Sequence, residues 1–360
     1  MQKQLTKTAL ALGTIALFAG LAGSAVAADW FPFKVERMDP PFSPDAKPTL
    51  VDYVPLTKAS KKWDICVSFP HMKDAYWLGV DYGVAEEAKR LGVKMQLVEA
   101  GGYTNLAKQI SQIEDCVSRG AQAVVIGAIS ADGLNGVIKT IAAKKIPVID
   151  VINGINSPDI SAKSLVSFQT MGAQAGEFIA KMHPKGSPAV KVGWFPGPAG
   201  AGWVEAAHKG FMEATKDSAL VILEPKYGDT GKEAQTKLIE DVLQAHPDVA
   251  YLVGPAVNSE AAVAILRERN LDKKIKVVAF HTNPGAVDGI QKGRILGAPS
   301  DSMVIQGRIA IDQAVRILEG KEYMKHVGPK IFMVDQNNIK TLPREILLAP
   351  VDYKPVFSVK

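Results

Sequence analysis

From residue 63 onward, short apolar runs alternate with amphipathic segments, and this alternation restricts the fold more than any other feature. About ten such runs recur, among them "DICVSF", "AVVIGA" and "KVVAF", and segments with helical spacing such as 106–119 and 132–144 lie between them. Strands that are apolar throughout and alternate with helices are typical of parallel sheets covered on both faces. The sequence therefore predicts an α/β fold.

The strand pattern restarts near Ser167, which predicts two domains. We expect two doubly wound, Rossmann-like lobes with parallel sheets. A single (β/α)₈ barrel is the alternative, since its roughly 250 residues would fit in the chain, but the number of strands and the break favour two lobes. The expected bounds are 63–166 plus 302–327 for lobe 1, and 167–301 plus 328–360 for lobe 2.

Residues 1–27 have the three parts of a secretory signal. A basic start is followed by an apolar middle and by small residues that end in Ala25-Val26-Ala27, so we expect export with cleavage after Ala27. A membrane anchor is the alternative, but the apolar run is shorter than the roughly 20 residues that a spanning helix needs. Residues 28–62 are rich in Pro, Lys and Asp, and we expect them to run as an extended leader over the surface.

The charged residues are interspersed along the chain. Loss of the signal would remove Lys3 and Lys7 and lower the net charge from +5 to +3. There is no basic stripe with interleaved aromatic residues, so a nucleic-acid partner is not expected. No later segment is long and apolar enough to span a membrane.

The chain has two cysteines, Cys66 in the first predicted strand of lobe 1 and Cys116 on a helix expected to pack near it. A disulfide is expected in an oxidising compartment. Two buried free thiols are an equally good interpretation, because the sequence gives no separation between the Cα atoms.

Aromatic rings and carboxylates are frequent just after the predicted strands. In open parallel sheets a ligand binds outside the carboxyl ends of the strands, and two facing lobes would bring these loops to one cleft. Aromatic faces attract a methylated ammonium by about 0.5–2 kcal/mol per well-placed ring, and stacking under a sugar uses the same groups. The predicted ligand-binding residues are Asp74, Tyr76, Trp77, Tyr103, Asn153, Phe168, Trp203, Glu205, His281 and Asp301.

Catalytic signatures are absent from the sequence. It has no H-E-x-x-H, no G-x-x-x-x-G-K-[ST], no G-x-S-x-G and no C-x-x-C. The "GPAGAGW" segment, 197–203, has the glycines of a phosphate cradle without the acidic partner of a dinucleotide site. Nothing near His281 supplies the ligands of a metal ion. We therefore expect a binding protein without a cofactor and not an enzyme.

The order of elements from residue 63 to about residue 321 resembles the type 1, ribose-type, periplasmic binding proteins. The resemblance rests on "QISQIEDCVSRGAQAVVIGAISADGL", "VVAFHTNPGAVDGIQKGRILGAPS" and "QGRIAIDQAVRILEGKEY". It implies a periplasmic protein with two α/β lobes that are joined by three crossing segments and hold a small ligand between them.

The blocks "KDAYW" and "EAGGY" resemble more narrowly those members of the family that sense trimethylamine N-oxide for a membrane sensor histidine kinase. This resemblance implies an aromatic cage in which Tyr76, Trp77 and Tyr103 take part, with Asp74 just before it. It also implies the periplasmic domain of such a kinase as the partner.

Two positions depart from the pattern of the sensing members. Phe168 stands where the sensing members have tryptophan, and His281 stands where they have tyrosine. Sugar-binding members hold hydroxyl groups with an arginine and an aspartate, and Glu205 and His281 occupy the corresponding places, which disfavours a pentose. The alternative function is that of a substrate-binding protein of an ABC importer for a sugar or another small polar solute.

Overall fold

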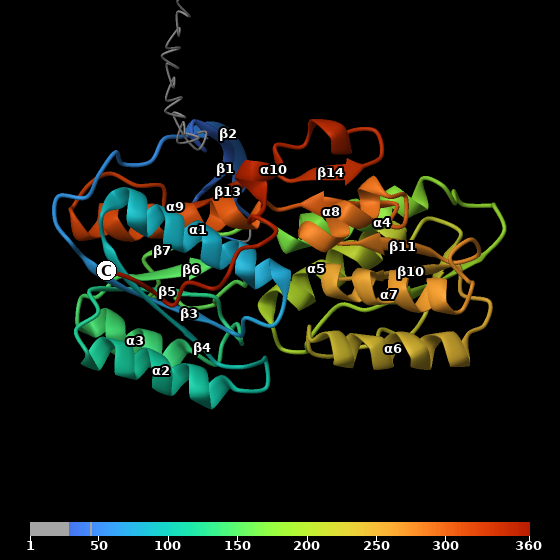
Figure 1. The fold of residues 1–360 in the computed structure, drawn as a ribbon, viewed down its shortest axis with the longest axis horizontal. Coiled ribbons are helices and arrows are strands. Elements are labelled where there is room, and N and C mark those ends of the chain that lie inside the picture. Colours follow the sequence, from blue (N-terminus) through green and yellow to red (C-terminus); the bar gives the residue numbers. More distant parts are fainter. Residues whose placement is uncertain (1–28, 44) are drawn as a thin grey trace, which may run out of the picture.

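In the computed structural model, which describes residues 29–43 and 45–360, the chain forms two α/β bodies side by side (Figure 1). Each body contains a parallel sheet with helices packed on it, which confirms the predicted fold class. The predicted signal peptide, 1–27, lies outside the described residues. We call the body that contains the first helix lobe 1 and the other body lobe 2.

The sheet of lobe 1 has nine strands, and its centre is parallel. Their spatial order is β15 (Ser358–Val359), β4 (Lys94–Glu99), β3 (Asp64–Phe69), β5 (Ala123–Ile126), β6 (Val148–Val151), β7 (Ala162–Ser164), β13 (His326–Pro329), β1 (Phe33–Asp39) and β2 (Lys47–Tyr53). The strands from β4 to β13 are parallel, and β15, β1 and β2 pair antiparallel with their neighbours. Both edges of the sheet are therefore formed by segments from the ends of the described chain.

Lobe 2 contains a four-stranded parallel sheet and a two-stranded antiparallel sheet. The parallel strands lie in the order β11 (Lys276–Ala279), β10 (Tyr251–Gly254), β8 (Val190–Trp194) and β9 (Leu220–Ile222), and β12 (Gly297–Ser300) pairs with β14 (Phe332–Asp335). The order changes direction at β8, where β9 lies on one side and β10 on the other. Such a reversal is the place where doubly wound sheets bind ligands.

Helices cover both sheets. In lobe 1, α1 (Ala75–Leu91) packs on α9 (Met303–Leu318), and α2 (Leu106–Ser118) lies beside α3 (Asn135–Ala143). In lobe 2, α4 (Phe168–Ala180) packs on α5 (Gly202–Thr215), while α6 (Lys232–Ala245), α7 (Ala256–Glu268) and α8 (Pro284–Gln291) form a second group. A short 3₁₀ helix (Ile339–Thr341) and α10 (Arg344–Leu347) follow β14.

Two helix pairs that carry strand-end residues are held close by glycines. A Cβ on Gly83 of α1 would lie 3.0 Å from the carbonyl carbon of Val304 in α9, and a Cβ on Gly172 of α4 would lie 2.8 Å from that of Ala207 in α5. Real Cβ atoms do not approach backbone atoms so closely, so a larger residue would push the helices apart. The first contact holds the middle of α1 against the start of α9 in lobe 1, and the second holds α4 against α5 in lobe 2.

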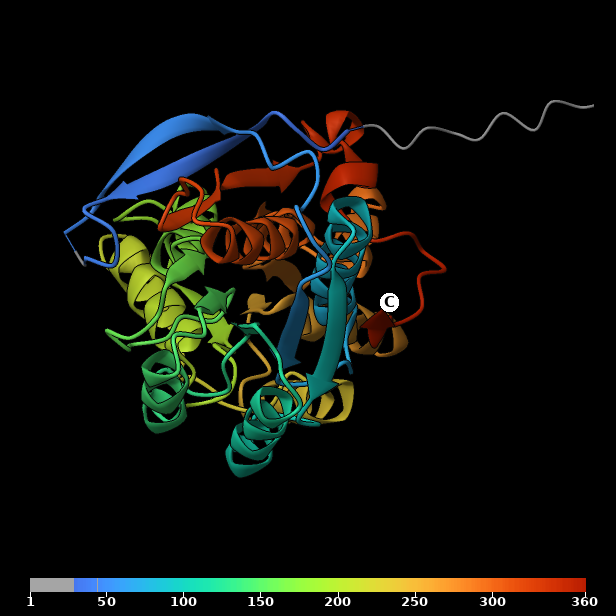
Figure 2. The same cartoon turned by 90° about the vertical axis from the view of Figure 1, so that its left-hand side faces the viewer.

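In the segment 28–62, the described residues (29–43 and 45–62) differ from the extended leader that the sequence predicts. They include an antiparallel hairpin, β1–β2, and β1 continues the sheet of lobe 1 by pairing with β13 (Figure 2). Trp30 just before the hairpin is buried, and its Nε1 donates a 3.0 Å hydrogen bond to Glu87 of α1. Most side chains of β2 are exposed, so this edge strand has no apolar alternation from which it could be predicted.

The C-terminal stretch 328–360, which we expect in lobe 2, is shared between the lobes. β14 pairs with β12 of lobe 2, but β15 pairs with β4 of lobe 1. Between β14 and β15, the Tyr353 hydroxyl donates a 2.9 Å hydrogen bond to Asp81 of α1. Because β15 has only two residues, it leaves no apolar run in the sequence. Its pairing with lobe 1 therefore could not be predicted.

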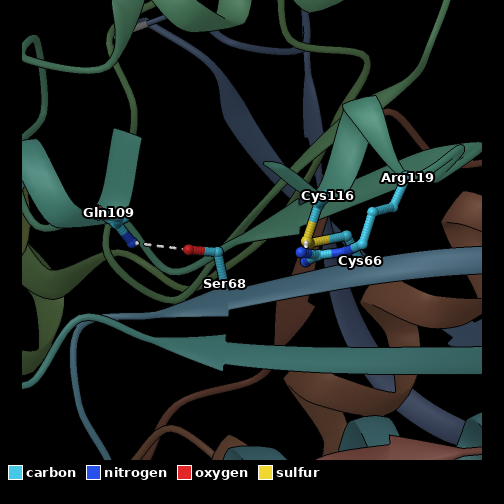
Figure 3. The surroundings of a disulfide bond; sticks show 5 residues. All are labelled: Cys66, Ser68, Gln109, Cys116 and Arg119. Atoms are coloured by element: carbon cyan, nitrogen blue, oxygen red, sulfur yellow. Dashed lines mark hydrogen bonds between the residues drawn. A yellow bond between two sulfur atoms is a disulfide. The ribbon is translucent and has the colours of Figure 1, made fainter. Parts of the chain in front are cut away.

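Cys66 of β3 and Cys116 of α2 form a disulfide, with 6.1 Å between their Cα atoms (Figure 3). The bond ties α2 to β3, an interior strand of the sheet of lobe 1. Near it, Gln109 of α2 donates to Ser68 Oγ at 3.3 Å and to the carbonyl of Gly127 at 2.9 Å. The helix is thus held to the sheet by a covalent bond and by hydrogen bonds, to which Gln112 adds one at 2.9 Å to the Glu99 carbonyl of β4.

Candidate ligand-binding site

A small hollow lies at the carboxyl ends of strands from both sheets. Its volume is about 20 Å³, which is room for one or two water molecules. The residues that line it are Asp74, Tyr76, Trp77, Tyr103, Ile152 and Asn153 from lobe 1, and Phe168, Trp203, Thr230, Pro255, Val257 and His281 from lobe 2.

Eight of the ten residues that the sequence predicts for the site line this hollow. Asp301 lies behind the wall and contacts a residue that lines it, Tyr76. Glu205 does not take part: it is exposed in the first turn of α5. It follows Trp203 by two positions, so on a helix the two side chains point to different sides.

Asp74 is the N-cap of α1 and faces the hollow. Its Oδ1 accepts hydrogen bonds from the backbone N–H groups of Tyr76 (3.1 Å) and Trp77 (3.0 Å), as an N-cap carboxylate does. Its Oδ2 makes no hydrogen bond within the described chain. Burial raises the pKa of Asp74 to about 6, although the two N–H groups lower it. Near neutral pH this side chain therefore offers one free carboxylate oxygen to a ligand.

Tyr76 is held in the wall by a buried carboxylate. Its hydroxyl donates to Asp301 Oδ2, which also accepts from Gln306 Nε2 at 3.0 Å. Burial raises the pKa of Asp301 to about 6, and burial and this negative charge raise the pKa of Tyr76 far above its ordinary value. The hydroxyl therefore keeps its proton, and the ring presents its body to the hollow.

The remaining rings pack in a chain across the two lobes. The centroid of Trp77 lies 4.7 Å from that of Phe69, and the centroid of Tyr103 lies 6.2 Å from that of Trp203, which in turn is 5.8 Å from that of Phe168. Contacts at these distances with tilted planes are favourable for aromatic pairs. The wall is therefore formed mainly by aromatic carbon.

His281 uses both ring nitrogens for the backbone. Its Nε2 accepts from the Ala256 N–H at 3.3 Å, and Nδ1 lies 3.4 Å from the carbonyl oxygen of Thr282. Burial lowers the pKa of His281 to about 4, so the ring is neutral at pH 7. It contacts Tyr76 edge-on, with 4.7 Å between centroids. His281 thus adds a neutral ring to the wall, and its hydrogen bonds do not point to a ligand.

Polar contacts join the lobes beside the hollow. His71 Nε2, from the loop after β3, lies 2.8 Å from Thr230 Oγ1 in the loop before α6, and Lys73 forms a 3.4 Å ion pair with Asp229. Burial lowers the pKa of His71 to about 4, so this hydrogen bond is between neutral groups at pH 7. The two lobes are therefore in direct contact beside the hollow, as in a closed form.

Four lining residues were not predicted: Ile152, Thr230, Pro255 and Val257. Ile152 and Pro255 directly follow β6 and β10, so their position after a strand was a usable signal that their apolar side chains hid. Ile152 has a φ of 69°, a backbone conformation that is strained for a β-branched residue and is seen mainly at functional sites. Thr230 lies in a long loop and had no such signal.

No group of three or more His, Cys, Asp or Glu side chains that could hold a metal ion occurs in residues 29–43 and 45–360. Within the same residues, no helix is long and apolar enough to cross a membrane. The chemistry that the hollow offers is thus limited to aromatic faces, a carboxylate and a few hydrogen-bond groups.

Residues 65–322 match the model of the family described as periplasmic binding protein domain, and the chain belongs to this family. Its members bind ligands and are not enzymes. Among curated relatives, the periplasmic protein TorT of Escherichia coli K12 is 34% identical over 300 residues, which cover 83% of this chain and 86% of TorT. The ribose import binding protein RbsB of Bacillus subtilis is 25% identical over 279 residues, covering 77% and 88%.

Solved structures give the same family and fold. An ABC transporter solute-binding protein from Bradyrhizobium sp. BTAi1, with bound Bis-Tris, is 68% identical and has a TM-score of 0.79, covering 92% of this chain and 99% of its own. TorT in complex with the TorS sensor domain, in the presence of trimethylamine N-oxide, is 32% identical with a TM-score of 0.74, covering 82% and 100%. These matches confirm the predicted resemblance to the ribose-type periplasmic binding proteins, and TorT is among the relatives found.

Proposed function

We propose that this chain is a periplasmic sensor protein that binds a small methylated amine or amine oxide, such as trimethylamine N-oxide, between its lobes. The observation that carries the proposal is the small aromatic hollow with one free oxygen of Asp74 in its wall. Rings attract the methyl groups of a cationic nitrogen, and the carboxylate adds Coulomb attraction. The neutral state of His281 supports this, because a charged ring would repel such a ligand.

The size of the hollow also supports a very small ligand. Trimethylamine N-oxide has five non-hydrogen atoms and a pentose has ten, so this hollow of about 20 Å³ has to widen less for the amine oxide. The lining contains no arginine, and among the described residues its one carboxylate is Asp74. A sugar needs several such groups to replace the hydrogen bonds that its hydroxyls make with water. The hollow therefore favours methylated amines over sugars.

We further propose that the ligand stabilises the closed form, and that a membrane sensor histidine kinase similar to TorS reads this form. A ligand can shift the equilibrium between open and closed forms only if it binds one of them better. Residues of both lobes line the hollow, so a ligand there gains all its contacts only when the lobes are closed. The likeness to TorT, which was solved with the TorS sensor domain, supports this partner.

An ABC importer is a second candidate partner, because the relative with 68% identity is described as an ABC transporter solute-binding protein. Its Bis-Tris is a tertiary amine, so it shares a nitrogen centre with the ligand proposed here. Genes beside this one distinguish the two functions: a hybrid sensor kinase supports sensing, and a permease with an ATPase supports import.

Isothermal titration calorimetry of the mature protein with trimethylamine N-oxide and with ribose tests the ligand. We expect binding of the amine oxide alone, with a gain in stability of about 2.7 kcal/mol at a ligand concentration 100 times the Kd. The variant Trp77→Ala should lose the affinity, whereas Glu205→Gln, at an exposed position, should keep it as a matched control. Absence of heat and of thermal stabilisation at millimolar amine oxide would refute the proposal.

A further inference from the structure

Trp203 presents a buried hydrogen-bond donor that the protein leaves unused. Its side chain is only 5% exposed and lines the hollow, yet its indole Nε1–H makes no hydrogen bond of good geometry in the described part of the chain; the Tyr103 hydroxyl beside it is close enough to accept only a weak one. Leaving a buried donor unpaired costs about 1–3 kcal/mol. Such a group in a native site indicates that something absent from the protein itself accepts the hydrogen bond.

The position of this indole is fixed by its surroundings. Gly197 has a φ of 120°, and a Cβ there would lie 3.1 Å from Cζ2 of Trp203, so the ring is seated where only glycine fits. Phe168 and Phe280 pack on it, with centroids 5.8 and 5.9 Å away. The indole therefore cannot easily turn to find a partner elsewhere.

A second donor lies next to it. The Tyr103 hydroxyl accepts a 2.9 Å hydrogen bond from Asn153 Nδ2 but donates to no described residue. Asn153 also donates to the Ala128 carbonyl at 2.7 Å, so its amide is held firmly and directs the lone pairs of the hydroxyl. Burial raises the pKa of Tyr103 above its ordinary value, which means that the hydroxyl keeps its proton.

We propose that Trp203 Nε1–H and the Tyr103 hydroxyl form a donor pair that binds an anionic oxygen of the ligand. This inference rests on the proposed function and makes the ligand class narrower. Asp74 and the rings suit a cationic methylated nitrogen, while the donor pair requires an oxygen acceptor in the same small molecule. The site then selects dipolar N-oxides over ammonium ions that lack the oxygen, because an ion without an acceptor would leave both donors unpaired.

Tetramethylammonium is a matched probe, since it replaces the oxygen of trimethylamine N-oxide by a methyl group of similar size. Titrations of both compounds into the wild type and into Trp203→Phe, which keeps an aromatic ring but removes the donor, test the proposal. A hydrogen bond to a charged group contributes about 1.5–3 kcal/mol, or roughly 10- to 150-fold in affinity. We expect Trp203→Phe to weaken the amine oxide by at least tenfold and to leave tetramethylammonium within about twofold. Tyr103→Phe should act in the same direction.

The outcomes separate the two proposals. If the wild type binds neither compound, the proposed function fails and the donor pair falls with it. The other case is that the wild type binds both compounds. If Trp203→Phe then weakens the binding of both equally, or leaves the binding of both unchanged, the donor pair alone is refuted and Trp203 serves packing only. Should Trp203→Phe not fold, the indole ¹H–¹⁵N resonance of Trp203 in the wild type decides. It should move downfield with the amine oxide and not with tetramethylammonium, and the same shift with both overturns the proposal.

Discussion

The substitution Gly127→Ala tests how tightly the wall of the hollow is built. Gly127 follows β5, where its N–H donates to the Ser68 carbonyl at 2.9 Å and its carbonyl accepts from Gln109. A Cβ at this position would lie 2.7 Å from Cζ3 of Trp77 and 3.4 Å from Cδ1 of Phe69. Backbone hydrogen bonds hold the strand end, so the Trp77 ring must give way.

The size of the effect follows from these distances. Carbon atoms in contact are about 3.5–4 Å apart, so the indole has to shift by about 1 Å, and Phe69 limits the directions open to it. When so large a ring moves by 1 Å, it takes up a volume similar to that of the hollow itself, which is about 20 Å³. We expect a loss of about 1–3 kcal/mol in stability from overpacking and at least a tenfold loss in affinity for the amine oxide.

Gly136→Ala is the matched control. Gly136 lies in the first turn of α3, and a Cβ there meets nothing within 4 Å. This variant should be as stable as the wild type or up to about 1 kcal/mol more stable, with unchanged affinity. Urea denaturation and calorimetry measure both quantities. If Gly127→Ala folds with the wild-type Kd, the wall is looser than described and the reasoning is refuted.

Three further predictions concern the scaffold and its charges. Cys116→Ser should lower the free energy of unfolding by up to about 4 kcal/mol in urea, because the disulfide closes a loop of 50 residues; equal midpoints with and without reductant in the wild type would contradict this. Asp74 has its pKa raised to about 6 from 3.8, so the native state binds the proton more tightly, and its contribution to stability falls as the pH rises from about 4 to 6. Asp74→Asn, which keeps the N-cap, should flatten that part of the curve of Tm against pH, and an identical slope would count against it. Trp30→Phe should cost about 1–2 kcal/mol in urea, because the buried Glu87 loses one of its donors; an unchanged midpoint would show that this hydrogen bond adds nothing.

The central strands of each lobe could be predicted because their burial shows in short, continuous stretches of the sequence. The strands that contain "DICVSF" and "AVVIGA" are buried on both faces, so they read as apolar runs. Residues just after such strands meet at one edge of the sheet, which is how Tyr76, Tyr103 and Phe168 could be grouped although they lie far apart in the sequence.

What could not be predicted depends on contacts between distant segments. The hairpin β1–β2 has mostly exposed side chains, and its place is set by pairing with β13, almost 300 residues later. Glu205 was assigned to the site from its place near a strand end, but the phase of α5 turns it to solvent. The role of His281 was also beyond the sequence, because its partner, the Ala256 N–H, belongs to another strand-end loop.

The presence of β1 and β15 in one sheet has a practical consequence for biosensor design. The described chain starts next to β1 and ends in β15, and both strands belong to the sheet of lobe 1. Fluorescent proteins fused to the two ends would both sit on lobe 1, so the energy transfer between them would stay constant when the lobes open and close as proposed. A reporter of ligand binding needs one fluorophore on lobe 2, for example on the solvent-facing side of α6, and the second fluorophore at either end of the chain.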